Sequence, residues 1–320
     1  MTPTSITRPT LVPRVLTGRE AFQQRLTRLL HRDATLGPIL ITPAFVMLTL
    51  LMAYPFVYAI YLSFTNKQIG APATYVGLEN FEKLVTMTVF HKTVVNSIVY
   101  TVIALVFKFV LGLGLAVMLN RPFVGQQLAK ALLLLPWIIP TVFSTMIWWW
   151  LLDPAFSIIN EVLVKKWGLL SKPIPFLIDG TTAMGSLILV NIWRGVPFFG
   201  ISFLAAMQSV PDELLDAARV DGATGWTAFW KITFPMITPV VAIVALISTI
   251  GTLGDFDLPY LLTGGGPNDS TTLFSVTSYT LAMKSGYIGM GAAVSMAMFP
   301  ILAILVVASL FQVRSRQEQM

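Results

Sequence analysis

Residues 209–239 read SVPDELLDAARVDGATGWTAFWKITFPMITP, and this polar stretch decides how the rest of the chain is interpreted. Pro211 and the acidic pair after it are typical of the first turn of a helix, where the macrodipole favours negative charge. The helix is predicted to run to about Val220, because Asp221-Gly222 then supplies a turn in which glycine takes positive φ. A second short helix over 224–232 is predicted to lead into the next apolar run.

Long apolar runs lie on both sides of this stretch. Only 11% of the 320 residues are charged, whereas soluble domains average about 25%. Six segments carry one charge or none, and each is as long as the ~20 residues that a helix needs to cross ~30 Å of hydrocarbon. They are residues 34–66, 93–120, 131–152, 180–211, 232–254 and 285–313. The sequence therefore predicts an all-α membrane protein with six transmembrane helices. Prolines that predict bends within spans 1, 3 and 6 are Pro43, Pro55, Pro136, Pro140 and Pro300.

The distribution of Lys and Arg predicts the orientation of these spans. Twelve lie in the two tails and the loops after spans 2 and 4, and seven lie in the opposite loops. The excess places both termini and the loop 209–235 in the cytoplasm. The predicted domains are a basic tail over 1–35, a six-span region over 36–313 and a short tail over 314–320. Within the first tail, residues 19–31 form either an amphipathic helix on the anionic inner leaflet or a solvated basic segment.

Several kinds of chemistry are excluded by composition. The chain has no Cys, which removes disulfides and thiolate chemistry. Its two histidines, His31 and His91, lie in different polar segments, so a metal site is not expected. The net charge of +6 follows from membrane topology and needs no nucleic-acid partner. No protease, lipase or phosphate-loop motif is present, so an intramembrane enzyme is disfavoured.

The helix within 209–235 is too short to cross a membrane and too apolar for a plain connector. Leu214, Leu215, Ala217 and Ala218 give it one apolar side. It could dock in a groove of a partner or rest on the cytoplasmic ends of its own spans. The physical chemistry of the residues leaves these two alternatives equal.

This loop resembles the coupling motif of binding-protein-dependent ABC importer permeases. That motif reads Glu-Ala-Ala, three residues, Gly, nine residues, Ile, one residue and usually Leu-Pro. The matching positions here are Asp216-Ala217-Ala218, Gly222, Ile232 and Phe234-Pro235, with Asp and Phe in place of Glu and Leu. The resemblance implies that the segment 211–222 docks on an ATP-hydrolysing subunit. Its implied coupling residues are Asp212, Glu213, Leu215, Asp216, Ala217, Ala218, Asp221, Gly222 and Ala223.

Two outer segments, 76–81 (VGLENF) and 262–267 (LTGGGP), resemble carbohydrate-uptake permeases of the maltose and glycerol-3-phosphate type, in particular the first subunit of the pair. The resemblance implies a bacterial or archaeal inner membrane, a second homologous permease, an ATPase dimer and an extracytoplasmic solute-binding protein. It also implies that this chain is not an enzyme and binds no cofactor or metal, since ATP and Mg²⁺ belong to the ATPase. The expected cargo is a sugar, a glycoside or a polyol phosphate.

Four ionisable residues fall within the predicted spans, and each needs a partner or water at that depth. They are Lys108, Arg194, Asp255 and Asp257. One interpretation is that an Arg194–Asp255 pair ties spans 4 and 5 together without meeting solute, and a structural role is favoured most strongly for Lys108. The other is a solute pathway, for which the candidate residues are Asn191, Trp193, Arg194, Asp255, Asp257 and Tyr260.

The alternative function is a secondary carrier driven by an ion gradient, with Asp255 or Asp257 as its proton site. Such a carrier has no use for a docking helix. Its usual sign, paired broken helices in two similar halves, is not seen in the sequence. The ATP-driven importer is therefore the preferred hypothesis.

Overall fold

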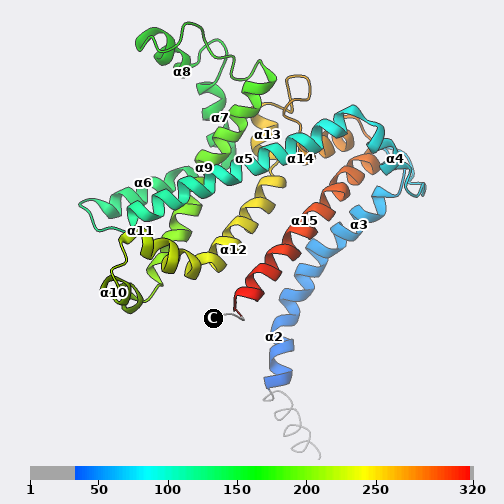
Figure 1. Ribbon diagram of the computed structural model, residues 1–320. Coiled ribbons are helices and arrows are strands. Elements are labelled where there is room, and N and C mark those ends of the chain that lie inside the picture. The colour runs from blue at the N-terminus through cyan, green and yellow to red at the C-terminus, as the bar shows by residue number, and fades with distance from the viewer. Residues whose placement is uncertain (1–32, 318–320) are drawn as a thin grey trace, which may run out of the picture. The chain divides into compact units, whose positions relative to one another are not determined.

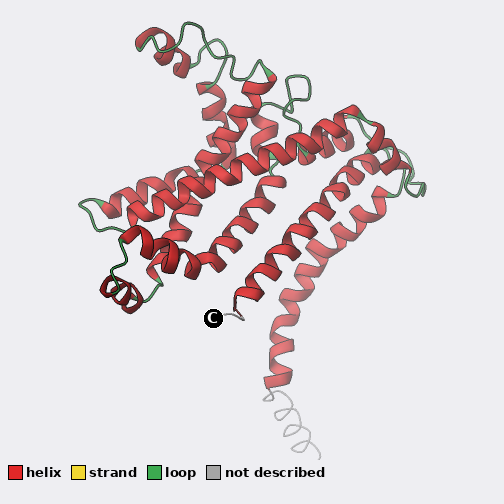
Figure 2. Cartoon of the chain, in the orientation of Figure 1, coloured by secondary structure: helices red, strands yellow, loops and turns green. Residues whose placement is uncertain are grey.

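The computed structural model describes residues 33–317, and every regular element in that range is helical (Figures 1 and 2). Short π-helical segments are labelled η. The elements are α2 (Asp33–Leu48), η1 (Thr49–Ala53), α3 (Tyr54–Ser63), α4 (Glu79–Thr86), α5 (Thr88–Leu119), α6 (Gln126–Ile138), α7 (Thr141–Leu151), α8 (Ile158–Asn160), η2 (Glu161–Lys166), α9 (Gly180–Gln208), α10 (Asp212–Val220), α11 (Gly225–Ala228), η3 (Phe229–Thr233), α12 (Phe234–Leu253), α13 (Asp257–Leu262), α14 (Phe274–Tyr279), η4 (Thr280–Lys284) and α15 (Ile288–Gln317).

The predicted membrane spans are present as long apolar helices. Within residues 33–317, five are long and apolar enough to cross a bilayer: Leu40–Ser63, Thr88–Leu119, Gly180–Gln208, Gly225–Leu253 and Ile288–Val307. Helices α6 and α7 pass the same test only as a pair, bent by 91°. Counted as one broken span, the pair brings the number to six. The all-α membrane fold predicted from the sequence is confirmed.

Proline accounts for the break between α6 and α7. Ile139 has extended backbone (φ −64°, ψ 126°), the conformation favoured by a residue before proline. Pro140 (φ −54°, ψ 139°) has no N–H with which to continue the helix. The bend predicted here is therefore confirmed.

Two other prolines are accommodated without a break. Just before Pro55 and Pro235 the helix widens into a π-turn, in which an N–H bonds to the carbonyl five residues back. These bonds are Tyr54 N–H to Thr49 O and Phe234 N–H to Phe229 O. The helix predicted over 224–232 is present with Thr224 as its N-cap, but it does not end before Pro235: residues 225–253 form one continuous helix.

The chain divides into two compact units, residues 1–58 and 59–320. In the first, the described residues form an apolar helix that continues into the second unit as the candidate span Leu40–Ser63. An apolar helix of this length is suited to cross a bilayer. The segment 19–31, for which an amphipathic helix and a solvated basic tail were both left open, lies outside the described residues.

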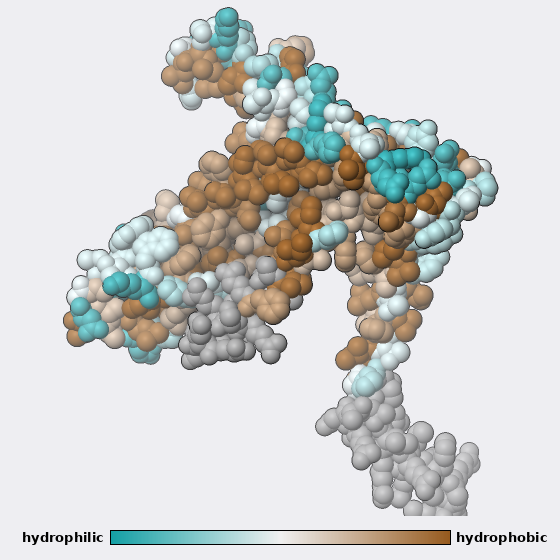
Figure 3. All heavy atoms as spheres, turned by 45° about the vertical axis from the view of Figure 1, so that its right-hand side comes forward, coloured by the Kyte–Doolittle hydropathy of each residue, from teal (hydrophilic) through white to brown (hydrophobic). Residues whose placement is uncertain are grey.

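The second unit is organised around α5 and α9. Gly112 of α5 lies so close to α9 that a Cβ there would collide with the side chain and backbone of Phe199. Small residues at a crossing point allow two membrane helices to approach closely. In Figure 3, apolar side chains cover much of the length of the helices in this unit, and hydrophilic ones gather toward their ends. Buried side chains that fill the space between α5, α9, α12 and α13 include Tyr100, Leu187, Phe203, Ile237 and Leu258.

The segments 76–81 and 262–267 both shape connections between spans. Asn80 of the 76–81 segment is buried, and its Nδ2 donates to Ser63 O and Thr65 O, both at 2.8 Å, at the end of span 1. In the second motif Gly264 and Gly265 have φ of +61° and +91°, values that L side chains rarely adopt. Both motifs therefore have clear structural roles in shaping the connections between spans.

Candidate functional site

Helix α10 ends in a well-defined turn. The Ala223 N–H donates to Ala218 O (2.9 Å), and the Gly222 N–H donates to Arg219 O (3.1 Å). This pair of bonds is the Schellman motif, which needs a left-handed residue after the helix, and Gly222 supplies it with φ +77°. The helix and the turn predicted from the sequence are both confirmed.

Only one side of α10 is packed against the protein. Ala218 is buried and Leu215 is half-buried against the hydrophobic cluster between α5, α9 and α12. Leu214 and Val220 are instead 43% and 88% exposed. The two alternatives that the sequence left open thus correspond to two faces of one helix. The other residues implied in coupling are exposed, except for half-buried Ala223: Asp212, Glu213, Asp216, Ala217, Asp221 and Gly222.

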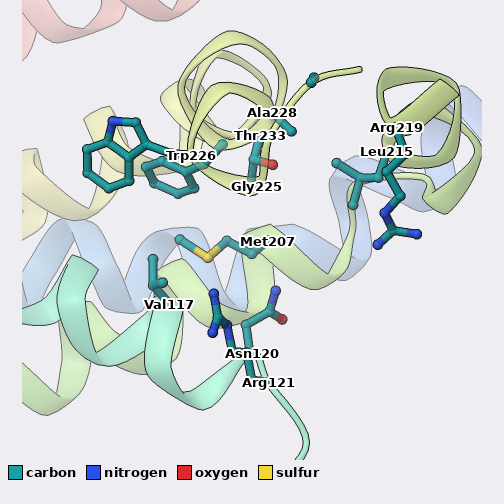
Figure 4. Close-up of a pocket in the computed structure, with 12 residues that line it drawn as sticks. Val117, Asn120, Arg121, Met207, Leu215, Arg219, Gly225, Trp226, Ala228 and Thr233 are labelled. Atoms are coloured by element: carbon teal, nitrogen blue, oxygen red, sulfur yellow. The ribbon is translucent and has the colours of Figure 1, made fainter. Parts of the chain in front are cut away.

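A cavity of about 580 Å³ lies between α10 and the neighbouring helix ends (Figure 4). Asn120 and Arg121 line it at the end of α5, and Trp226 lines it from α11. Leu215 and Arg219 line it from α10. The inner side of α10 is therefore in part packed and in part lines this cavity, through Leu215 and Arg219.

A second polar region lies among the spans and centres on Lys108 of α5. Its Nζ donates to Asn191 Oδ1 (2.9 Å) on α9 and to Thr252 Oγ1 (2.8 Å) on α12. Asn191 Nδ2 donates in turn to Asp255 Oδ2 (3.3 Å), which also accepts the Tyr100 hydroxyl (3.1 Å). The amide of Asn191 thus links the ammonium to the carboxylate. We call these five residues the Lys108 cluster.

Gly195 makes room for the long side chain at the centre of this cluster. A Cβ at position 195 would collide with Lys108 Cδ. Lys108 itself is 3% exposed, so its charge is satisfied only by the groups around it.

Arg194 does not pair with Asp255. Its Nη2 donates to Thr141 Oγ1 (2.6 Å) on α7, and its Nε is buried without a partner. The ion pairs within residues 33–317 are Glu79–Lys83, Glu161–Lys165 and Asp216–Arg219. The proposed Arg194–Asp255 ion pair is therefore wrong: Arg194 bonds to Thr141, and Asp255 accepts from Asn191 and Tyr100.

A cavity of about 390 Å³ opens beside the cluster. Three of the candidate pathway residues line it, namely Asn191, Arg194 and Asp255. Trp137 and Phe198 add an aromatic pair with ring centroids 6.0 Å apart and planes 19° from parallel. Other lining residues that the sequence did not single out are Thr141, Ser248, Gly251 and Thr252.

The other three candidate pathway residues lie elsewhere. Trp193 packs edge-to-face on Trp148 at 5.5 Å. Asp257 is exposed in the first turn of α13. Tyr260 stacks on Phe256 at 4.9 Å, with Lys284 Nζ 4.9 Å from its ring centroid. The structure thus divides the predicted set in two.

The sequence did not predict that Lys108 lies at the centre of a hydrogen-bonded cluster. Its position in a long apolar run signalled that it needs a partner, but the run does not show which helix supplies one. Gly195 was the available signal, because a small residue inside a span marks a point where a neighbouring helix or side chain approaches closely.

The family profile and the relatives that match this chain all describe membrane components of transport systems. Residues 108–317 match the profile of the family described as "Binding-protein-dependent transport system inner membrane component". The sulfoquinovosyl glycerol transport system permease protein SmoG of Agrobacterium fabrum is 31% identical, over 83% of this chain and 86% of that protein. The trehalose transport system permease protein SugA of Mycobacterium tuberculosis is 28% identical, over 90% and 91%.

Among solved structures, a bacterial ABC transporter that imports the acidic polysaccharide alginate superposes with a TM-score of 0.77, at 24% identity, over 91% of this chain and 99% of that one. This likeness shows a shared fold. Since the family profile covers about two thirds of the chain, the chain belongs to the family of binding-protein-dependent transport system inner membrane components.

Proposed function

We propose that the chain is the transmembrane permease subunit of an ATP-driven importer that moves a sugar or sugar derivative into the cytoplasm. A permease of this family is a non-catalytic membrane subunit. Relatives whose names specify sulfoquinovosyl glycerol, trehalose, or trehalose and maltose support a carbohydrate cargo. Mono- to oligosaccharides, glycosides and polyol phosphates all fit this class.

The observation that carries the proposal is the open face of α10. A helix of nine residues packs on the bundle by one side only and ends in a Schellman turn, with Leu214 and Val220 exposed. Exposed apolar side chains on a short amphipathic helix fit a groove in a partner protein. We assign that groove to an ATPase dimer, which binds ATP and Mg²⁺, so that closure of the dimer is transmitted through the segment 211–222.

The remaining parts of the assembly follow from the same proposal. A second, homologous permease pairs with this chain, and an extracytoplasmic binding protein delivers the solute. Both termini face the cytoplasm, and the complex resides in the inner membrane of a bacterium or archaeon. The solute pathway passes the cavity beside the Lys108 cluster, where aromatic faces and hydrogen-bonding groups suit a sugar.

Cross-linking tests the docking of α10 directly. Because the chain has no Cys, Ala217→Cys places a single thiol on the exposed side of α10. A maleimide that carries a photoactivatable benzophenone needs only this one thiol; after illumination it should join the chain to the ATPase subunit in the assembled complex, and Ala73→Cys in an exposed outer loop should give no such product. Absence of the product at position 217, in a complex that still hydrolyses ATP, would overturn the docking.

Transport measurements separate the importer from the carrier. In proteoliposomes, uptake should require ATP and the loaded binding protein. Uptake by this chain without the ATPase, driven by a proton or sodium gradient, would favour the secondary carrier instead.

A further inference from the structure

The cavity beside the Lys108 cluster carries more positive than negative charge. Three ionisable groups line it: Lys108, Arg194 and Asp255. Lys108 and Asp255 balance each other through the amide of Asn191. In the sequence, Asp257 was the second acid that could balance the charges of Lys108 and Arg194. In the structure it is exposed on α13 and does not line the cavity. One cationic group, the Arg194 guanidinium, is left in excess.

The bonding of Arg194 is also incomplete. A guanidinium has five N–H donors in a fixed planar fork. Here Nη2 donates to the Thr141 hydroxyl, which is neutral, and Nε is buried without any acceptor. A charge left in this condition within a membrane is costly. Its natural complement is a group with two or three anionic oxygens, which accepts bidentate hydrogen bonds from the fork.

Asp255 lines the same cavity, but no carboxylate in the described part of this chain forms an ion pair with Arg194. The three ion pairs in that part of the chain lie on α4, on α8–η2 and on α10, and both oxygens of Asp255 already accept bonds, from Tyr100, Asn191 and the Leu258 N–H. The cavity meanwhile offers about 390 Å³ and the stacked rings of Trp137 and Phe198. Ring faces for a sugar and a cation for an acidic substituent therefore occur in one place.

We propose that the solute carried through this cavity is an acidic sugar derivative, whose carboxylate, sulfonate or phosphate is bound by Arg194. This inference rests on the proposed function and specifies its substrate class. A neutral sugar would leave the charge of the guanidinium unbalanced as it passes, whereas an acidic sugar supplies the missing charge. Lys108 is not the binding group, because its ammonium is already held by Asn191 and Thr252.

Thiol labelling measures the charge of the cavity without knowledge of the solute. Ser248 lines the cavity, and Ser248→Cys gives this chain a single thiol there. The complete transporter, turning over ATP, is treated with two methanethiosulfonates, one anionic (sulfonatoethyl) and one cationic (trimethylammonium-ethyl). Mass spectrometry of this chain gives both rates, and Ala73→Cys in the outer loop provides the reference ratio.

The anionic reagent should be favoured at position 248, relative to position 73, by on the order of tenfold. Arg194→Gln should return the ratio to the reference, and Arg194→Lys should keep most of the preference. Equal ratios at the two positions would overturn the proposal, since an acid of the second permease would then neutralise Arg194. Failure of either reagent to react at position 248 would overturn it as well, because a passing solute must reach this wall.

Protection by sugars then tests the ligand class. Methyl glucoside is compared with methyl glucuronide, methyl sulfoquinovoside and methyl glucoside 6-phosphate, which differ from it by one acidic group. At least one acidic glycoside should slow labelling fivefold or more at a concentration where methyl glucoside has no effect, and Arg194→Gln should abolish this protection. Equal protection by methyl glucoside, or no protection by any of the three, would overturn the acidic substrate class. ATP-dependent uptake with the binding protein would still test the importer function independently.

Discussion

Helix α10 and the Lys108 cluster are the two polar regions of functional interest in a chain that is 55% hydrophobic, and they are held by opposite means. The end of α10 is fixed by bonds among residues 218–223. The cluster joins residues that are 64, 83, 144 and 155 positions apart in the sequence. The turn of α10 depends on neighbouring residues, so it can be weakened without loss of the fold. The Lys108 cluster joins distant helices, so weakening it destabilises the fold itself. The expected effects of mutation differ accordingly.

The largest effect is expected for Lys108→Met. This change leaves the Asp255 carboxylate buried without its cation and removes a donor from Asn191 and Thr252. Breaking a buried charge pair from one side costs about 3–5 kcal/mol. The amount of folded complex, measured by size-exclusion chromatography of a fluorescent fusion, should fall at least tenfold.

The double variant Lys108→Met with Asp255→Asn should recover much of that loss, because no charge is then stranded. Arg194→Met combined with Asp255→Asn should give nearly additive losses, since these two groups are not bonded. Lys165→Met, in an exposed pair with Glu161, is the control and should leave the amount of folded complex unchanged. Strong recovery in the Arg194 pair but not in the Lys108 pair would contradict the assigned connections.

A smaller loss is expected for Gly195→Ala. The added methyl group would collide with Lys108 Cδ and displace the ammonium from its acceptors. Overpacking of this kind costs about 1–3 kcal/mol. Gly185→Ala, on the same helix and with open space around the new Cβ, is the matched control. The melting temperature of the purified complex should fall for the first and not for the second, and equal melting temperatures would show that Lys108 can shift freely.

Gly222→Ala should act on transport rather than on assembly. A left-handed conformation costs an L residue about 1–2 kcal/mol, so the Schellman turn would loosen and α10 would change its direction. Uptake should fall severalfold while the amount of complex stays near that of the wild type. Gly225→Ala, at a glycine without positive φ and with no atom near the new Cβ, is the control. Unchanged uptake in Gly222→Ala would remove the argument that the turn aims the helix.

The same contrast explains what the sequence could predict. The bounds of α10, its turn and the break at Pro140 follow from neighbouring residues, and all were predicted. The pairing of the buried charges was not, because two cations and two acids can be matched in several ways at similar depth. The choice depended on how α5 crosses α9, which the apolar pattern of each helix does not encode. Asp257 likewise lies beyond the end of α12 at Leu253, in the first turn of α13, which the apolar pattern did not predict.

The smallest effect on stability is expected for Asp216→Asn. The carboxylate pairs with Arg219 on the surface, where the two side chains are 66% and 73% exposed, and such pairs contribute about 0.2–1 kcal/mol. The melting temperature should therefore stay within about 2 °C of the wild type. If the exposed face of α10 docks on the ATPase, uptake should nevertheless fall, and Asp216→Glu, which keeps the charge, should retain it. A stability loss as large as that of Gly195→Ala would instead place this pair within the folded body. The contrast between a docking face and a structural cluster would then fail.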